Sequence, residues 1–205
     1  MANSAVHHLG LATYDYEACL DFYTRVLEFD VVYQEQWETP DGVPILKHLF
    51  LDTGNGSVIS FMCPTPENPE YPDRWDCNLN SGLGVRHGTY HFSFAVDSLD
   101  ELERRQKTLR ERGCEATEIF DHGFCKSVYF LSPDGLNLEF TLTTRVFNDD
   151  DKILKRRTQP GNTNYIGRPE LARHDFELIG YTGAALDKAV AAAAGTGTYA
   201  FAGKE

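Results

Sequence analysis

The fold of this chain is decided by two stretches that repeat one pattern, HLGLA at residues 8–12 and HFSFA at residues 91–95. Each stretch reads histidine, apolar, small, apolar, alanine, and alternation with a period of two is typical of a half-buried β-strand. A helical pattern follows each stretch. The first helix is expected to begin at Asp15 and the second at Ser98, because both residue types are favoured helix N-caps. The repetition indicates two copies of one structural unit.

The ends of the two copies match as well. NGSVISF at residues 55–61 aligns without gaps with DGLNLEF at residues 134–140, and in each a turn dipeptide leads into a strand. Between the helix and this last strand, each copy has room for two more strands. They are expected at about residues 29–37 and 45–52 in the first copy and at about 115–120 and 127–131 in the second. Each copy therefore has the order βαβββ.

The domain organisation follows from these two modules. The modules cover about residues 5–63 and 89–144, and together they form an α+β domain over residues 1–144 with a curved mixed sheet around a cleft. A proline-rich connection joins them. Residues 145–205 form a C-terminal extension that ends in an alanine-rich helix and packs on the domain or on a second subunit.

The composition is that of a globular protein with an acidic surface. Of the 205 residues, 41% are hydrophobic and 24% are charged, and 31 Asp and Glu against 19 Lys and Arg give a net charge of −12. This charge repels phosphate groups, so we expect neither nucleic acid nor an anionic membrane as a partner. We also see no membrane-spanning stretch and no signal peptide, so we expect a cytoplasmic protein whose five cysteines are reduced.

Three strands each carry a good metal ligand on the face that points away from the helix. Strand alternation places His8, His91 and Glu139 on that face. Two imidazoles and one carboxylate favour Fe(II), Mn(II), Zn(II), Ni(II) or Co(II) over Ca(II). Ser60 occupies the position in the first module that Glu139 occupies in the second, and it is a poor ligand. The expected site therefore has three protein ligands and open positions for a substrate and a second reactant.

Three longer stretches carry a family resemblance, HHLGLATYDYEACLDFYTRVLEFDVV, YHFSFAVDSLDEL and VYFLSPDGLNLEFT. They resemble the vicinal-oxygen-chelate superfamily, which contains glyoxalase I, fosfomycin-resistance proteins, bleomycin-binding proteins and extradiol ring-cleaving dioxygenases. The third stretch, together with His122, is close to the signature of the extradiol dioxygenases. Ser132 departs from that signature, which has an acidic or amide residue there.

The resemblance implies a role for several side chains. The metal ligands would be His8, His91 and Glu139, and Tyr129 would hydrogen-bond a substrate oxygen bound to the metal. Extradiol enzymes also have a histidine that moves protons, and here either His122 or His87 is expected to fill that role. The substrate site is expected to include Ser60 and two aromatic residues of the connection that cover the pocket, Tyr71 and Trp75.

We therefore interpret the chain as a single-domain, non-haem Fe(II) extradiol-type dioxygenase, with Mn(II), Zn(II) or Ni(II) as alternative metals. Its expected partners are a catecholic aromatic substrate, O₂ and further copies of the chain in a homo-oligomer. Two alternatives stay open. One is another metal-dependent reaction in the same cleft, such as a glyoxalase-like isomerisation or lyase reaction or a thiol transfer. The other is a binding protein that confers resistance by sequestering a small molecule.

Overall fold

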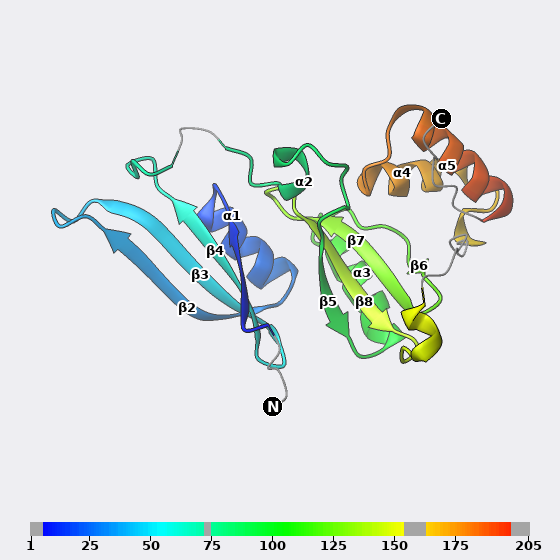
Figure 1. The fold of residues 1–205 in the computed structure, drawn as a ribbon, viewed down its shortest axis with the longest axis horizontal. Helices are drawn as coiled ribbons and strands as arrows, with labels where there is room; N and C mark the ends of the chain where they lie inside the picture. The colour runs from blue at the N-terminus through cyan, green and yellow to red at the C-terminus, as the bar shows by residue number, and fades with distance from the viewer. Residues whose placement is uncertain (1–5, 72–74, 154–162, 198–205) are drawn as a thin grey trace. The chain divides into compact units, whose positions relative to one another are not determined.

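A computed structural model describes residues 6–71, 75–153 and 163–197 of the chain (Figure 1). Its internal contacts divide the chain into two units, Met1–Leu83 with Ser132–Leu136, and Gly84–Leu131 with Asn137–Glu205. Each unit contains one four-stranded sheet. Of the C-terminal extension at 145–205, residues 154–162 and 198–205 lie outside the described part.

The first unit has the predicted order of one strand, one helix and three strands. Its sheet has the strand order β1-β4-β3-β2, in which β1 is parallel to β4 and the other neighbours are antiparallel. The helix α1 continues without a break as one π-helical turn, Phe22–Val26. The elements are β1 (His8–Ala12), α1 (Tyr16–Asp21), β2 (Asp30–Glu38), β3 (Pro44–Gly54) and β4 (Ser57–Pro64).

The second unit repeats this topology. Its sheet has the order β5-β8-β7-β6, again with one parallel pair, β5 with β8, and antiparallel neighbours elsewhere. The α+β class and the two βαβββ modules are thereby confirmed. The elements are β5 (Phe92–Val96), α3 (Leu99–Glu111), β6 (Phe120–Asp121), β7 (Cys125–Leu131) and β8 (Asn137–Thr143).

The helices begin where the sequence predicts. The Asp15 carboxylate accepts from the Ala18 amide at 3.0 Å, and the Ser98 hydroxyl accepts from the Glu101 amide at 3.1 Å. Each bond satisfies one of the amides that a helix start leaves without an intrahelical partner. Helix α3 is followed by Gly113 with φ of +82°, a conformation that glycine adopts without steric cost.

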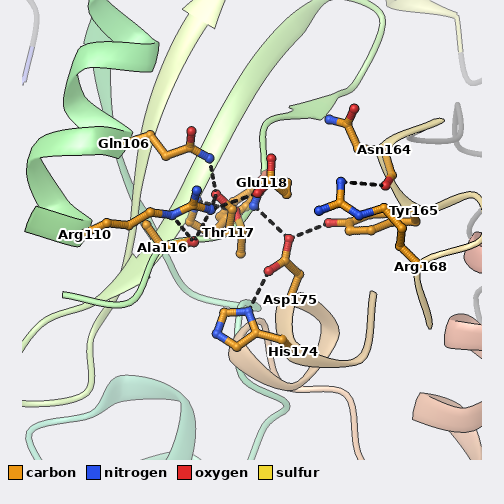
Figure 2. Close-up of polar contacts among 11 residues, drawn as sticks. Gln106, Arg110, Ala116, Thr117, Glu118, Asn164, Tyr165, Arg168, His174 and Asp175 are labelled. Carbon is orange, nitrogen blue, oxygen red and sulfur yellow. Dashed lines mark hydrogen bonds and ion pairs between the residues drawn. The ribbon is translucent and has the colours of Figure 1, made fainter. Parts of the chain in front are cut away.

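The strand expected at 115–120 is much shorter than predicted. Within this segment, β6 and one isolated bridge between Ala116 and Phe130 pair with β7, and the Thr117 amide donates to the Tyr129 carbonyl of that strand at 3.0 Å. Other backbone groups of the segment bond side chains instead, as Figure 2 shows. The carbonyl of Thr117 accepts from Gln106 at 2.6 Å, and the amide of Glu118 donates to Asp175 at 2.7 Å.

Each unit buries its own apolar core between the helix and one face of its sheet. In the first unit Tyr23 and Leu27 of the helical segment are fully buried with Leu49, Ile59 and Phe61 of the sheet. In the second unit the equivalent core is made of Leu102, Leu109, Phe130, Leu138 and Phe140. Because side chains alternate along a strand, the opposite face of each sheet is left for other contacts.

The described part of the C-terminal extension belongs to the second unit. It forms the short turns Asp149–Lys152 and Thr163–Tyr165 and the helices α4 (Pro169–Leu178) and α5 (Gly183–Thr196). The turn Thr163–Tyr165 and the two helices share a buried cluster with Phe120 of β6, to which Tyr165, Phe176 and Ala189 contribute. The connection between the modules contains one short helix, α2 (Leu79–Gly82). None of the helices in the described ranges is both long and apolar enough to cross a membrane.

Candidate metal centre and pocket

Two predicted metal ligands lie side by side in the second unit. Glu139 is in the middle of β8, where its register partner on β5 is Ser93, and His91 directly precedes β5. The Nε2 atom of His91 is 3.3 Å from Oε2 of Glu139. Two donors that each lie about 2.1 Å from one ion, at about a right angle, are separated by about 3 Å. The pair therefore has the spacing that one metal ion requires.

The other ring nitrogen of His91 supports this assignment. Nδ1 lies 3.1 Å from the carbonyl oxygen of Gly88, and because a carbonyl only accepts, Nδ1 carries the proton. With a metal bound, the neutral ring would present an unprotonated Nε2 on the side of Glu139. A ligating histidine typically donates its second N–H to a backbone carbonyl in this way, which fixes both its tautomer and its orientation.

Glu139 is held as a carboxylate at the site. Its residue is only 5% exposed, and burial by itself raises the pKa of a carboxyl group. Hydrogen bonds from His91, Ser127 and Thr141 oppose that effect and lower the pKa of Glu139 to about 2. The same contact with Glu139 raises the pKa of His91. In the absence of a metal, protonated His91 and ionised Glu139 form an ion pair. A bound metal ion would take the place of the proton between Nε2 of His91 and the carboxylate of Glu139.

A second polar pair lies next to the first. Tyr129, on β7, is the register partner of Glu139, and its hydroxyl is 2.9 Å from Nε2 of His122. Burial raises the pKa of Tyr129 well above its usual value, and burial lowers the pKa of His122. Both groups are therefore neutral near pH 7, and they share one hydrogen bond. The ring centroids of His91 and Tyr129 are 6.4 Å apart.

Three of these side chains, His91, His122 and Tyr129, line a cavity of about 190 Å³ within the second unit. Arg86 adds to its polar lining, and Phe120 contributes an apolar side. The remaining apolar lining comes from Phe176, Ile179 and Tyr181, at and just beyond the end of α4. The sequence gives no signal for this contribution, because only tertiary packing brings α4 to the sheet.

His8 and Ser60 lie in the first unit, on one face of its sheet. Ser60 pairs with Gly10 on β1, as Glu139 pairs with Ser93 on β5, so Ser60 has the position expected from the repeat. Its hydroxyl donates to the carbonyl of Leu9 at 3.3 Å. His8 is exposed, and its Nδ1 is 2.8 Å from Nδ1 of His7, which leaves Nε2 for an ion. The place of Ser60 in a substrate site stays a prediction.

The assignment of all three metal ligands likewise stays a prediction. His8 belongs to the first unit, whereas His91 and Glu139 belong to the second. Within either unit, the residues that the structure describes bring together no group of three His, Cys, Asp or Glu side chains able to hold a metal. The chemistry of the donor set nevertheless fits the expected ion, because two imidazoles and one carboxylate are the ligands of many non-haem Fe(II) sites.

The two candidates for the proton-moving histidine have different surroundings in the structure. His122 lines the cavity and contacts Tyr129. His87 packs its backbone and Cβ against Gly180, where φ is +91° and a side chain would collide. The two aromatic residues of the connection belong to the first unit, with ring centroids 6.0 Å apart, and Trp75 packs on Tyr14. Whether Tyr71 and Trp75 contact a substrate stays a prediction.

One histidine to which the sequence assigns no role shares a sheet face with His8. His48, on β3, is 7% exposed, and its Nδ1 is 3.2 Å from Glu35 Oε1. Within the described ranges its Nε2 has no hydrogen-bond partner. Phe50 lies between the two imidazoles, with ring centroids 4.3 Å from His48 and 5.8 Å from His8. This face of the first sheet is therefore rich in imidazole and aromatic rings.

Comparisons with known proteins agree with this architecture. Residues 5–140 match the model of the Glyoxalase/Bleomycin resistance protein/Dioxygenase superfamily. The chain is 28% identical over 172 residues to biphenyl-2,3-diol 1,2-dioxygenase 2 of Rhodococcus globerulus, which covers 84% of this chain and 77% of that protein. Its fold is similar to the solved glyoxylase/bleomycin resistance protein/dioxygenase domain from Frankia sp. EAN1pec, with 20% identity, a TM-score of 0.54, and coverage of 69% of this chain and 99% of that one.

The family match contains all three candidate metal ligands, His8, His91 and Glu139, and ends within β8. It also covers more than half of the 205 residues. The chain belongs to the glyoxalase/bleomycin resistance protein/dioxygenase superfamily.

Proposed function

We propose that this protein is a metal-dependent extradiol-type dioxygenase, which cleaves a catecholic aromatic ring with O₂. The observation that carries the proposal is the juxtaposition of two pairs of side chains, three of which, His91, Tyr129 and His122, line one cavity. His91 and Glu139 lie 3.3 Å apart with the spacing of metal ligands, and Tyr129 and His122 lie beside them as a neutral acid–base pair. The similarity to a biphenyl-2,3-diol dioxygenase supports this reaction class.

The proposed reaction needs no other reductant. The carbon–carbon bond beside the two ring hydroxyls breaks, both atoms of O₂ enter the product, and the ring loses the four electrons that O₂ gains. The product carries a carboxylate at one end and an aldehyde or ketone at the other. An Fe(II) ion held by His8, His91 and Glu139 would supply a Lewis acid and a path for electrons between catechol and O₂.

The side chains of the second unit have separate tasks in this proposal. Tyr129 keeps its proton near pH 7 and donates a hydrogen bond to the anionic oxygen of the substrate. His122 is neutral and accepts a proton from the substrate hydroxyl, which it later returns. Phe120 and the residues from α4 exclude water and contact the ring face.

The first test measures metal content. The protein is purified without oxygen, and its Fe, Mn, Zn and Ni are measured by elemental analysis. We expect about one equivalent of Fe in the parent and much less in His8→Ala, His91→Ala and Glu139→Ala. His174→Ala is the matched control, because this histidine lies on α4 and does not line the cavity. Full metal content in His91→Ala or Glu139→Ala contradicts the proposed centre.

The second test measures the reaction. The Fe(II)-loaded protein is mixed with a panel of catechols in air, while O₂ uptake and the yellow ring-opened product are followed. We expect one O₂ consumed per ring cleaved. A loaded protein that cleaves none of the catechols overturns the proposal. Turnover of another substrate without O₂, and with Ni(II) or Zn(II) preferred, would assign the isomerase or transferase reaction instead.

A further inference from the structure

The C-terminal extension forms part of the pocket. Phe176 lies on α4 and is buried, with only 1% of its surface exposed. Tyr181 follows in the turn after this helix and is 8% exposed. Both line the cavity together with His91 and Tyr129. The extension therefore does more than cover the sheet, because its aromatic side chains determine the shape of the space beside the candidate ligands.

A buried carboxylate fixes the position of these two aromatic residues, Phe176 and Tyr181, which form the aromatic wall of the cavity. Asp175 directly precedes Phe176 and is 0% exposed. Its oxygens accept from the amide of Glu118 at 2.7 Å and the hydroxyl of Tyr165 at 2.8 Å, and they lie 2.8 Å from Nδ1 of His174 (Figure 2). Hydrogen bonds to an ionised acceptor are stronger than neutral ones, and a buried carboxylate is costly to leave unpaired. The next residue along α4 is therefore held in place.

A glycine brings the turn after α4 close to the segment that precedes β5. Gly180 has φ of +91°, and a Cβ built there would collide with Cβ of His87. This close approach places Tyr181 against the neighbouring residue, Arg86. The guanidinium carbon of Arg86 lies 4.7 Å from the centre of the Tyr181 ring, and both residues line the cavity.

The guanidinium of Arg86 has no carboxylate partner among the described residues and is therefore available to bind an anionic ligand. In the described ranges no carboxylate lies within ion-pair distance of Arg86, whereas Arg25, Arg104 and Arg145 each pair with one. A guanidinium stacked on an aromatic ring keeps its N–H edge free, and that edge binds a carboxylate through two parallel hydrogen bonds. In a chain of net charge −12, an anionic ligand needs such a local positive group.

We propose that Arg86, stacked on Tyr181, makes this pocket selective for a single-ring aromatic ligand that carries a carboxylate, with the ring against Phe176. The volume agrees with one ring, because a cavity of about 150 Å³ accommodates benzene and this one has about 190 Å³. The proposal deepens the proposed function by naming its substrate class, and it rests on that function only for the reaction, not for binding.

The test uses two probes of equal size, benzoate and benzamide. Neither has a diol, so neither is a ring-cleavage substrate, and binding to the full chain is measured by calorimetry without added metal. We expect benzoate to bind about 10-fold tighter than benzamide, a difference of about 1.4 kcal/mol. Arg86→Gln removes this preference, and Arg86→Lys retains part of it. Phe176→Ala weakens the binding of both probes equally, because it removes the contact of the Phe176 side chain with the aromatic ring of the probe.

Arg168→Gln is the matched control. Arg168 also belongs to the C-terminal extension, is exposed, and bonds a backbone carbonyl at 3.4 Å outside the cavity, so its loss should leave the preference unchanged. Circular dichroism checks that each variant is folded. Equal affinity of the parent for the two probes, or a preference that survives in Arg86→Gln, overturns the proposal.

A kinetic comparison separates this proposal from the proposed function. If the loaded enzyme cleaves 3,4-dihydroxybenzoate and 3,4-dihydroxybenzamide with equal kcat/KM, the dioxygenase assignment stands and the role of Arg86 is wrong. If benzoate binds selectively through Arg86 but no catechol is cleaved, the anion site stands and the dioxygenase assignment is wrong. We expect selective binding together with a kcat/KM about 10-fold higher for the acid.

Discussion

The hydroxyl of Tyr129 lies 2.9 Å from Nε2 of His122, and both side chains line the cavity that contains His91. This contact joins a phenol that stays protonated to an imidazole that stays neutral, because burial raises the pKa of Tyr129 and lowers that of His122. Such a pair presents one donor and one acceptor to a bound substrate without a net charge. In the proposed reaction, this pair would take part in proton transfer between substrate and protein.

The first prediction removes the phenolic hydroxyl. In Tyr129→Phe the ring and its contact with Phe120 are retained, with ring centroids 5.6 Å apart in the parent, but the proposed hydrogen bond to the substrate is lost. We expect kcat for catechol cleavage to fall by about 10²-fold, as is typical when an acid–base or oxyanion contact is removed. Iron content should stay at the parent level. Unchanged kcat in this variant would assign Tyr129 a packing role only.

The repeat made much of this architecture predictable from the sequence. Ser60 and Glu139 were placed at equivalent positions by an alignment without gaps, and the sheets place them against Gly10 and Ser93 in the same register. Local signals such as the helix start at Asp15 also agree, because an N-cap acts within a few residues. These features depend on periodicity and short-range chemistry, which a single sequence contains.

The cavity wall could not be predicted in the same way. Phe176 and Tyr181 have no sequence neighbour among the candidate ligands, and only the fold of α4 against β7 brings them to His122. The strand expected at residues 115–120 is shorter than predicted for a related reason. The backbone of Glu118 bonds Asp175, a residue far along the chain, so local β-propensity was overridden by a tertiary contact.

A second prediction concerns thiol reactivity. Burial is the main cause that raises the pKa of Cys77 to about 12 and that of Cys114 to about 11, so neither is a thiolate at pH 8. Because the thiolate is the nucleophile, we expect both to resist iodoacetamide in the folded protein and to react in urea. Mass spectrometry of peptides after timed labelling measures this. Alkylation of Cys77 at the rate of a free thiol in the native protein would contradict its burial.

A third prediction concerns acid. Glu101 contacts Arg104 and Arg105 at 2.7 Å each, and these hydrogen bonds lower the pKa of Glu101 to about 2 from its usual 4.5. A carboxyl with a depressed folded-state pKa stabilises the fold above its unfolded-state pKa, and the stabilisation is lost as the pH falls from about 4.5 to about 2. In Glu101→Gln the free energy of unfolding should therefore depend less on pH over this range.

Urea unfolding at pH 5, 4 and 3 measures this difference. Because the Glu101 side chain is partly exposed, we expect the effect to be at most about 1 kcal/mol. Glu103→Gln on the same helix is the control, since Glu103 is exposed and its loss should leave the pH dependence of the parent. A parent and a Glu101→Gln variant with parallel pH profiles would show that the arginine contacts add no stability in solution.

The last prediction tests how the C-terminal extension is held. In Asp175→Asn the side chain keeps its size but loses its charge. One oxygen of Asp175, Oδ2, accepts from both the Glu118 amide and the Tyr165 hydroxyl, and the neutral amide oxygen that takes its place is a weaker acceptor for both donors. We expect the free energy of unfolding to fall by about 1–3 kcal/mol. Asp187→Asn is the control, because Asp187 pairs with Arg173 at 2.6 Å in an exposed ion pair worth about 0–1 kcal/mol. Urea unfolding followed by tyrosine fluorescence measures both. If Asp175→Asn is as stable as Asp187→Asn, the buried carboxylate does not hold α4, and the position of Phe176 must depend on the apolar cluster alone.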